Sequence, residues 1–344
     1  MLTKPIMRIA AACIPRLQII CSTCLALSFL LALSACTAMK VKLGMKVYLA
    51  QTPVSSIEAS LPQGPGIAPG QKSPLVVTVT EPDGKVLRTE GKGGGKVMWK
   101  DLSVSATVVT VNQKGVISLS KDPRVSDGKI GHVAITVPTH PDVHADLDIP
   151  FRYDVAFVCN FSGSPGSSGM SGADGMNGTS GSNGSTDPNN PSPGGDGTNG
   201  TNGSDGGDGG PGGNAPAVQV RMTLQSGSHP LLQASVSAPA HTRLYLVDPQ
   251  GGSLTVKADG GPGGSGGSGG RGGSGGSGGM GTPSGNSGSN GSDGRSGFAG
   301  PPGKGGIITV TYDPQVKPYL AVLHLSSRNG PSPVLQEAQV APLW

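Results

Sequence analysis

Five alternating histidines and aspartates are the side chains of this chain whose types and spacing could do chemistry. They are His140, Asp142, His144, Asp146 and Asp148. A spacing of two residues places them on one face of a β-strand, with apolar residues on the opposite face. Two histidines and a carboxylate could bind zinc, and His140, Asp142 and His144 are the candidate ligands. An ordinary half-exposed strand shows the same pattern, and the sequence favours that interpretation, with no metal.

Two catalytic motifs occur inside a glycine-rich tract and follow from its repeat alone. Residues 263–267 (Gly-Gly-Ser-Gly-Gly) match a nucleophile elbow, and residues 261–266 match a dinucleotide-binding fingerprint. Both motifs need a strand before them and a helix after them, and neither is expected here. The sequence therefore predicts no catalytic residue, no cofactor and no enzyme.

Five Asp-Gly steps in the glycine-rich tracts resemble calcium-binding β-roll repeats. They begin at Asp174, Asp196, Asp205, Asp208 and Asp293. Those repeats also need an apolar residue inside each turn, and this chain lacks it. The resemblance is incomplete, so calcium binding is not expected.

The beginning of the chain has the pattern of an exported protein. Three basic residues precede a mostly apolar stretch from Leu17 to Ala35. The residues Leu33-Ser34-Ala35-Cys36 resemble the bacterial lipoprotein signal, which is cut just before a cysteine that then carries a diacylglycerol and further acyl chains such as palmitate. The resemblance implies that Cys36 is the lipidation site and that the mature chain begins there. A membrane-spanning helix is the alternative, but it would not explain small residues directly before a cysteine.

The residue after Cys36 bears on where the protein lies. By the same resemblance, an aspartate at that position would retain a lipoprotein in the inner membrane, and this chain has Thr37. We therefore expect a cell-envelope location in the outer membrane. Membrane lipid, reached through acylated Cys36, is the expected partner.

Charge and cysteine content argue against a nucleic-acid-binding protein and against a fold held by internal disulfides. Removal of residues 1–35 takes away three of the 25 basic residues and none of the 21 acidic ones, which leaves a net charge of about +1. Charges of both signs are scattered along the chain, so no basic field is expected to recruit nucleic acid. Besides Cys36, Cys159 is then the remaining cysteine, which excludes an internal disulfide. Cys159 ends an apolar run and is expected to be a buried thiol.

Short alternating runs separated by turns predict an all-β sandwich between residues 40 and 153. Trp99 is followed by a valine-rich strand at 106–111, an Asn-to-Gly turn and a second valine-rich strand at 116–119. This order resembles bacterial Ig-like domains of group 2, which are common in surface proteins. The resemblance implies an Ig-like β-sandwich over 36–160. Trp99 is expected in its core rather than as a platform for stacking sugars.

Six further runs predict a second, small β module that a glycine-rich tract splits in two. The runs are 218–224, 231–236, 242–247, 254–258, 307–312 and 319–325. The tail from Asn329 contains three prolines and is expected to be irregular. The edges of the intervening tract resemble glycine-rich regions of uncharacterised bacterial surface lipoproteins, which implies location and architecture only.

Glycine recurs at every third position in two tracts that hold 43 of the 59 glycines. Such a period suits polyproline II-type helices, which turn once in three residues. Each tract contains two runs of similar length: 163–184 and 194–212, then 260–281 and 285–306. Three interpretations of the tracts are open: a polyglycine II bundle, a disordered linker and a collagen-like trimer. The bundle resembles glycine-rich antifreeze proteins and certain phage tail-tip adhesins.

Geometry favours the bundle among these interpretations. A straight rod from Gly260 to Gly306 would span roughly 140 Å, so the strands on either side of the tract could hardly share a module. A fold-back at residues 282–284 returns the chain to where it left. We therefore predict that each tract folds back on itself.

The predicted fold class is all-β: an Ig-like β-sandwich followed by a second small β module with two inserted Gly-rich polyproline II or polyglycine II tracts. The predicted order is a lipoprotein signal peptide (1–35), the Ig-like domain (36–160), Gly-rich tract 1 (161–215), the first part of the β module (216–258), Gly-rich tract 2 (259–306) and the second part with the tail (307–344). The predicted function is that of a lipid-anchored bacterial cell-envelope protein with a structural or adhesive role and no catalysis. The alternative is a surface binding module for a polysaccharide or a protein partner, and a metal-dependent enzyme is less favoured.

Overall fold

The computed structural model describes residues 39–344 except 226, 228 and 240. The chain is mostly β, in several small sheets with a few short helices, which confirms the predicted class at that level. It divides into two compact units after Arg152. The predicted domain end at 160 differs from this boundary because residues 156–160 pair with a strand of the second unit.

The described part of unit 1 consists of short strands in three antiparallel sheets. The strands are β1 (Ser56–Ser60), β2 (Lys72–Pro74), β3 (Val76–Thr80), β4 (Val86–Arg88), β5 (Ser103–Thr107), β6 (Val109–Val111), β7 (Val116–Leu119), β8 (Gly131–Val137) and β9 (His140–Ile149). The 3₁₀ helices are η1 (Leu49–Gln51), η2 (Gly91–Gly93), η3 (Trp99–Asp101) and η4 (Pro123–Val125). The sheet orders are β1-β3-β4, β2-β7-β6 and β5-β8-β9.

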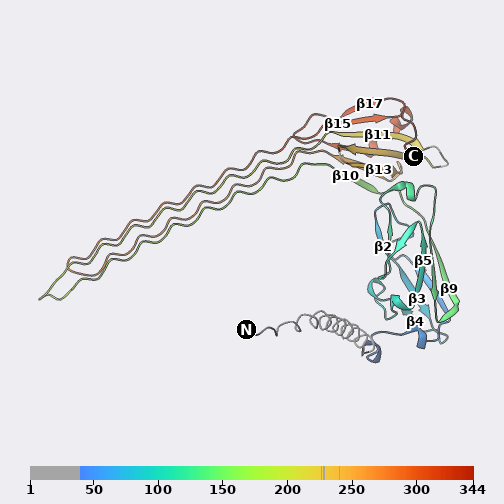
Figure 1. Ribbon diagram of the computed structural model, residues 1–344, viewed down its shortest axis with the longest axis horizontal. Helices are drawn as coiled ribbons and strands as arrows, with labels where there is room; N and C mark the ends of the chain where they lie inside the picture. Colours follow the sequence, from blue (N-terminus) through green and yellow to red (C-terminus); the bar gives the residue numbers. More distant parts are fainter. Residues whose placement is uncertain (1–38, 226, 228, 240) are drawn as a thin grey trace, which may run out of the picture. The chain divides into compact units, whose positions relative to one another are not determined.

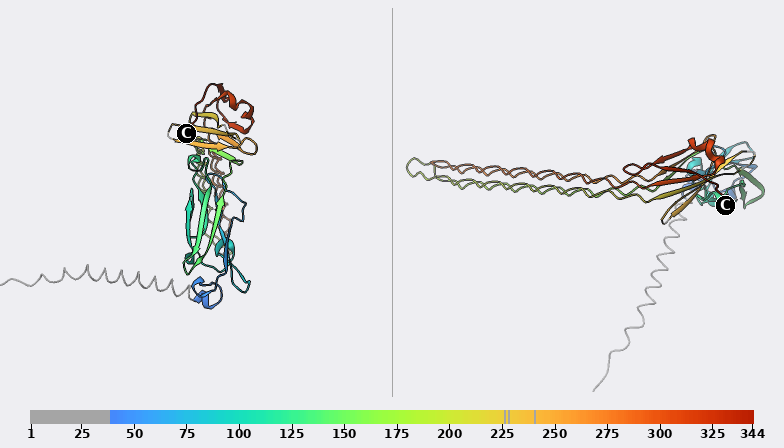
Figure 2. Two further views of the ribbon diagram at one scale, coloured as in Figure 1. Left: turned by 90° about the vertical axis from the view of Figure 1, so that its right-hand side faces the viewer. Right: turned by 90° about the horizontal axis from the view of Figure 1, so that it is seen from above.

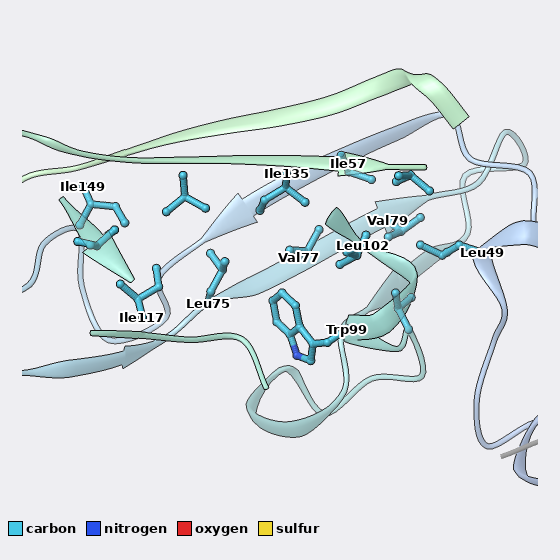
Figure 3. Packing of buried hydrophobic residues seen from close by; sticks show 14 of the residues in the cluster. Leu49, Ile57, Leu75, Val77, Val79, Trp99, Leu102, Ile117, Ile135 and Ile149 are labelled. Atoms are coloured by element: carbon cyan, nitrogen blue, oxygen red, sulfur yellow. The ribbon is translucent and has the colours of Figure 1, made fainter. Parts of the chain in front are cut away.

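Alternating apolar side chains of these sheets meet in one buried cluster (Figure 3). Val77 of β3, Ile117 of β7 and Ile135 of β8 are fully buried in it. Burial of each such side chain stabilises the fold by roughly 1.5–3 kcal/mol. Trp99 is 7% exposed and belongs to the same cluster, which confirms its predicted place in the core.

The turn between β6 and β7 covers Trp99. The Oδ1 atom of Asn112 accepts the N–H groups of Lys114 and Val116, both at 2.9 Å. Gly115 has φ +68°, and a Cβ added there would overlap the Trp99 ring. Glycine is therefore needed for both backbone conformation and space.

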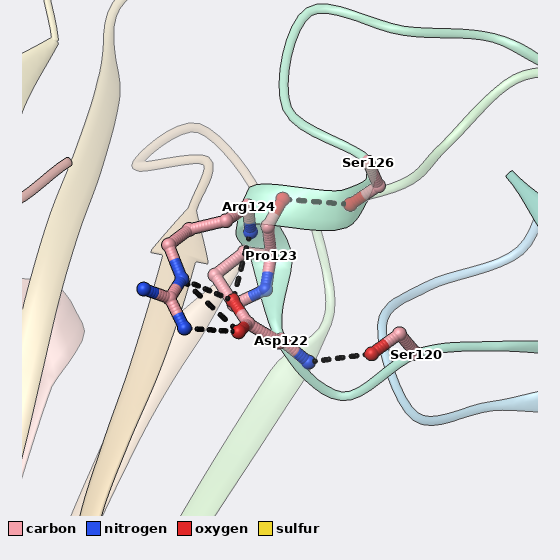
Figure 4. A network of polar contacts seen from close by, with 5 residues as sticks. All are labelled: Ser120, Asp122, Pro123, Arg124 and Ser126. Atoms are coloured by element: carbon pink, nitrogen blue, oxygen red, sulfur yellow. Dashed lines mark hydrogen bonds and ion pairs between the residues drawn. The ribbon is translucent and has the colours of Figure 1, made fainter.

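A second turn, at η4, is held by short polar side chains (Figure 4). Asp122 accepts the N–H of Arg124 at 3.0 Å and also binds its guanidinium, with the shortest contact at 2.6 Å. This hydrogen bond to the Arg124 side chain holds the pKa of Asp122 below its ordinary value. The Ser126 hydroxyl donates to the carbonyl of Pro123 at 3.1 Å.

The described part of unit 2 holds two sheets. The strands are β10 (Ala156–Asn160), β11 (Val218–Gln225), β12 (Leu231–Ala238), β13 (His241–Val247), β14 (Ser253–Lys257), β15 (Ile308–Tyr312), β16 (Leu323–Ser326) and β17 (Val334–Glu337), and the 3₁₀ helix is η5 (Pro314–Val322). One sheet is parallel, in the order β10-β14-β16, and the other is mixed, in the order β13-β12-β11-β15-β17. Their apolar side chains form a second buried cluster.

Two sequence predictions fail in unit 2. Residues 319–322 of the predicted strand 319–325 belong instead to η5, which starts at Pro314, where the fixed φ of proline suits the first helical position, and is capped by Asp313. A strand begins only at Leu323. The tail, predicted to be irregular, forms β17, which pairs in parallel with β15.

Both glycine-rich tracts fold back and leave the sheets as four extended segments that run side by side (Figure 1, Figure 2). We call them rod 1 (163–184), rod 2 (194–213), rod 3 (260–281) and rod 4 (285–306). Antiparallel hydrogen bonds join rod 4 to rod 3, from Gly285 N–H to the Gly279 carbonyl at 3.0 Å through to Gly303 and Gly261 at 2.8 Å. These bonds confirm the predicted fold-back at 282–284.

The rods continue the pairing of the strands that lead into them. β10 and β14 pair in parallel, with Ala156 opposite Ser253. Rods 1 and 3 keep this offset, since Asp174 binds the N–H of Arg271, 97 residues further on. β11 and β15 likewise pair at the offset that rods 2 and 4 use, which is 90 residues. The strands therefore set the register of the rods.

Candidate functional site

Cys36, the predicted lipidation site, lies outside the described residues, so its acylation stays a prediction. Within residues 39–344, apart from the three gaps, no helix has the length and apolar character needed to cross a membrane.

The three candidate zinc ligands, which the sequence did not favour as a metal site, lie on β9 but do not converge. Asp142 and His144 are exposed, whereas His140 is half-buried and its Nδ1 lies 3.1 Å from the hydroxyl of Thr139. An irregular register between β8 and β9 at Thr136 accompanies this change of exposure. In the described part of the chain, no group of three His, Cys, Asp or Glu residues could hold a metal ion.

The other two aspartates of β9 form a site that sequence spacing alone did not indicate. His132 of the neighbouring strand β8 places its Nδ1 2.9 Å from Asp148 Oδ1 and its Nε2 3.3 Å from Asp146 Oδ1. The hydrogen bond that the His132 ring donates to Asp148 is the main reason why the pKa of His132 is raised. All three side chains are exposed, so this is a surface charge pair.

The four rods are bonded to one another through their backbones. Rods 1 and 3 are parallel, as are rods 2 and 4, while the pairs 1–2, 2–3 and 3–4 are antiparallel. Rod 2, for example, donates from Gly210 to Ser167 of rod 1 at 2.7 Å, and rod 3 donates from Gly264 to Gly210 at 2.9 Å. Rods 2 and 3 therefore lie in the middle, and each contacts three neighbours.

Glycine marks the positions where one backbone touches another. In rod 3, a Cβ added to Gly272 would overlap the carbonyl of Gly291 in rod 4, and one added to Gly273 would overlap that of Met176 in rod 1. Rod 4 has two neighbours and one glycine in most of its triplets, such as Gly288, which faces Thr198 of rod 2. Rod 3 has two glycines in each triplet, and one of them faces a carbonyl of rod 4 while the other faces a carbonyl of rod 1.

Asparagine and aspartate side chains satisfy N–H groups at the outer edges of the rods. All five aspartates of the Asp-Gly steps accept a backbone N–H of another rod at 2.7 to 2.8 Å. The pairs are Asp174 with Arg271, Asp196 with Asn286, Asp205 with Arg295, Asp208 with Phe298, and Asp293 with Gly272. Each side chain thus takes the place of a further rod. These carboxylates act here as structural acceptors.

Prolines obey the same pattern. The offset of 97 places Pro165 beside Pro262, and the offset of 90 places Pro211 beside Pro301. A proline at the receiving position has no N–H to satisfy. At Pro262 and Pro301, which have no N–H to donate, the residues opposite are Pro165 and Pro211, which have no side-chain acceptor.

Rods 1 and 2 share a third kind of match. Thr201 and Ser204 of rod 2 accept the N–H groups of Met176 and Ala173 at 2.7 Å. Where rod 2 has Gly210 instead, rod 1 has Ser167, whose Oγ would lie 2.5 Å from an added Cβ. In each of these pairs, a side chain from either rod 1 or rod 2 occupies the space between the two rods.

Gly207 is the exception, because an added Cβ there would meet nothing closer than the Met170 backbone nitrogen at 3.4 Å. Two residues whose backbones bond to this stretch of rod 2 carry large apolar side chains. Met170 accepts the Gly207 N–H at 2.8 Å and is 83% exposed. Phe298 donates its N–H to Asp208 and is 80% exposed. They lie at one level of the bundle.

The motif matches in residues 261–267 have no catalytic context. This stretch is extended rod, without the helix that either motif needs after it. Gly263 faces the Gly300 carbonyl of rod 4, and Gly264 faces the Ser167 carbonyl of rod 1. The glycines are there to admit a neighbouring backbone.

Cys159 is fully buried in the core of unit 2, as its apolar context predicted. Burial is the main reason why the pKa of its thiol is raised, and it also raises the pKa of the neighbouring Tyr245. The ring of Tyr245 lies 5.8 Å from that of Phe157. This thiol is protonated and enclosed, which makes it a poor nucleophile.

A comparison with protein-family models finds no match to this chain, and none of the curated proteins compared with it matches either.

Proposed function

We propose that this is a lipid-anchored protein of the bacterial cell envelope, held by its anchor in the outer membrane, with a structural or adhesive role and no catalysis. The observation that carries the proposal is the set of four rods, whose triplets are used to bring backbones together. Side chains of rod 3 between its glycines are mostly serine. Such a bundle suits a rigid projection.

We infer the finer fold on the same grounds. Unit 1 is taken as an Ig-like β-sandwich, because antiparallel sheets enclose one core that contains Trp99. The rods are taken as polyglycine II, since a period of three residues and bonding to several neighbours suit that conformation. Weak Cα–H contacts to carbonyls would add to the N–H bonds between rods.

Mass spectrometry of the protein purified from membranes tests the anchor. We expect an acylated Cys36 at the N-terminus and no peptide from residues 1–35. The acylated chain should also stay in the membrane at high salt, because burial of acyl chains is insensitive to screening. Release of the intact chain by salt alone would contradict the proposal.

A binding module for a polysaccharide or a protein partner is the second candidate. The exposed residues Met170 and Phe298 favour it, because apolar side chains gathered on a surface can mark an interaction site. Replacing both by serine should then abolish adhesion of cells that display the protein. Met280, which is also exposed, offers the control Met280→Ser, with adhesion unchanged.

A further inference from the structure

Two lysine-rich stretches that are far apart in the sequence meet at one end of unit 1. Val47 forms a bridge with Val97, and its N–H donates to the Lys96 carbonyl at 3.0 Å. Leu49 N–H donates to Asp101 at 3.1 Å. Figure 1 shows the first stretch, in blue, next to β4. The lysines of both stretches, which we call the basic end, are Lys40, Lys42, Lys46, Lys92, Lys96 and Lys100.

The basic end carries a net positive charge, whereas the rest of the mature chain is net negative. Residues 39–50 and 89–101 contain six lysines and two acidic residues, Glu90 and Asp101, which gives a net charge of +4. The mature chain carries about +1, so the remainder is near −3. Lys46 is paired with Glu90 at 2.7 Å, while the other five lysines are exposed.

A cleft of about 630 Å³ lies at this end, lined by Lys40, Lys46 and Lys100 among others. Glu90, the partner of Lys46, also lines this cleft and offsets part of its positive charge. Lys100 also lies over the ring of Tyr48, 5.0 Å from its centre.

Large apolar side chains are exposed beside these lysines. Met39 and Leu43 are each 64% exposed, and Met45 is 56% exposed. Lysines mixed with exposed apolar side chains are typical of segments that lie at a lipid surface. Nucleic acid would not account for the apolar component.

We propose that the basic end docks onto the anionic headgroups of the membrane that holds the lipid anchor. The inference rests on the proposed acylation of Cys36. Lys40 follows Cys36 by four residues, so the chain allows a separation of at most about 14 Å. The anchor thus delivers this end of unit 1 to the headgroups, and its charge and apolar side chains then hold it there.

Reactivity of lysines tests the proposal without any substitution. The full acylated protein is incorporated into vesicles of phosphatidylcholine, with or without phosphatidylglycerol, and acetylation of each lysine is followed by mass spectrometry. In vesicles that contain phosphatidylglycerol, we expect Lys92, Lys96 and Lys100 to be acetylated about fivefold more slowly than in pure phosphatidylcholine. Addition of 0.5 M salt, at which the screening length is about 4 Å, should restore the rate. Lys72 and Lys129, exposed elsewhere in unit 1, should be unaffected.

A charge-reversed variant provides the matched control. The triple substitution Lys92→Glu, Lys96→Glu, Lys100→Glu should remove the protection of Lys40 and Lys42, whereas Lys72→Glu, Lys121→Glu, Lys129→Glu should preserve it. Equal rates in both vesicle types, with the wild-type protein incorporated, would overturn the docking proposal. Failure to enter pure phosphatidylcholine vesicles would instead count against the anchor, which needs no anionic lipid.

Discussion

Gly206 and Gly207 are adjacent in rod 2, yet their surroundings differ. A Cβ on Gly206 would overlap the carbonyl of Gly267 in rod 3, whereas one on Gly207 would reach only ordinary contact distance from Met170. Substituting each position in turn therefore tests whether glycine is needed for lack of space, as at Gly206, or for some other reason that would apply equally to Gly207.

Gly206→Ala should lower the free energy of unfolding of unit 2 by about 1–3 kcal/mol, the usual cost of overpacking a well-filled site. Gly207→Ala should change it by less than about 0.5 kcal/mol. Urea unfolding followed by circular dichroism measures both. Equal losses for the two variants would show that rods 2 and 3 do not touch as described.

The charge pair at His132 makes a prediction about pH. Asp148→Asn should lower the pKa of His132 toward its ordinary value of 6.5, because its main hydrogen-bond partner loses charge. The raised pKa means that the pair stabilises the fold below pH 6.5, and that this contribution is lost as pH rises through the folded-state pKa. NMR titration of the His132 ring measures the shift.

Asp142→Asn is the control for this titration, since Asp142 lies on the same strand and is not a partner of His132 in the contacts described above. It should leave the pKa of His132 nearly unchanged. If Asp142→Asn lowered that pKa as much as Asp148→Asn does, the specific pair would be wrong.

At the scale of elements, each rod is held to several others in one register. The offsets of 97 and 90 residues and the antiparallel pairs place residues 172–174, 203–205, 269–271 and 293–295 at one level of the bundle. Removing all four triplets shortens the rods together and keeps every glycine in phase.

We expect this twelve-residue deletion to be less harmful than deletion of Asp174 alone. The single deletion moves Met176 to the place of Gly175, where a Cβ would overlap the carbonyl of Thr201, and repeats the clash along rod 1. Thermal unfolding by calorimetry would compare the two variants. A single deletion tolerated better than the twelve-residue one would exclude a registered bundle.

The sequence predicted the contacts of the rods but not their register. Glycine at every third position shows where backbones meet, and the breaks between runs show where each tract turns. Every triplet offers the same backbone partners, however, so the repeat cannot choose among registers. Strand pairs such as Ala156 and Ser253 make that choice, and the matched prolines, Pro165 with Pro262, become visible only then.

Other features escaped prediction because they depend on distant segments. Alternation was enough to predict the exposed side of β9, apart from the half-buried His140, and the buried place of Trp99. His132 reaches Asp148 only because β8 and β9 pair, and Lys40 joins Lys100 only because Val47 pairs with Val97. Charges that look scattered along the sequence are therefore gathered in the fold.

At the scale of the whole molecule, the proposed function assigns different tasks to the two units. Unit 1 follows the anchor and carries the basic end, and unit 2 carries the rods. The task of unit 2 depends on the rods being ordered within one chain, because a flexible linker would not project and a collagen-like trimer would need three chains.

The distance between rods 1 and 3 is the most direct test of this account. Ser171 and Ser268 are exposed and their hydroxyls lie 3.2 Å apart, so spin labels on Ser171→Cys and Ser268→Cys report on one level of the bundle. Pulsed electron spin resonance should give a single narrow peak at short distance, unchanged when labelled chains are diluted with unlabelled ones. A broad distribution, or a short distance that disappears on dilution, would contradict the account.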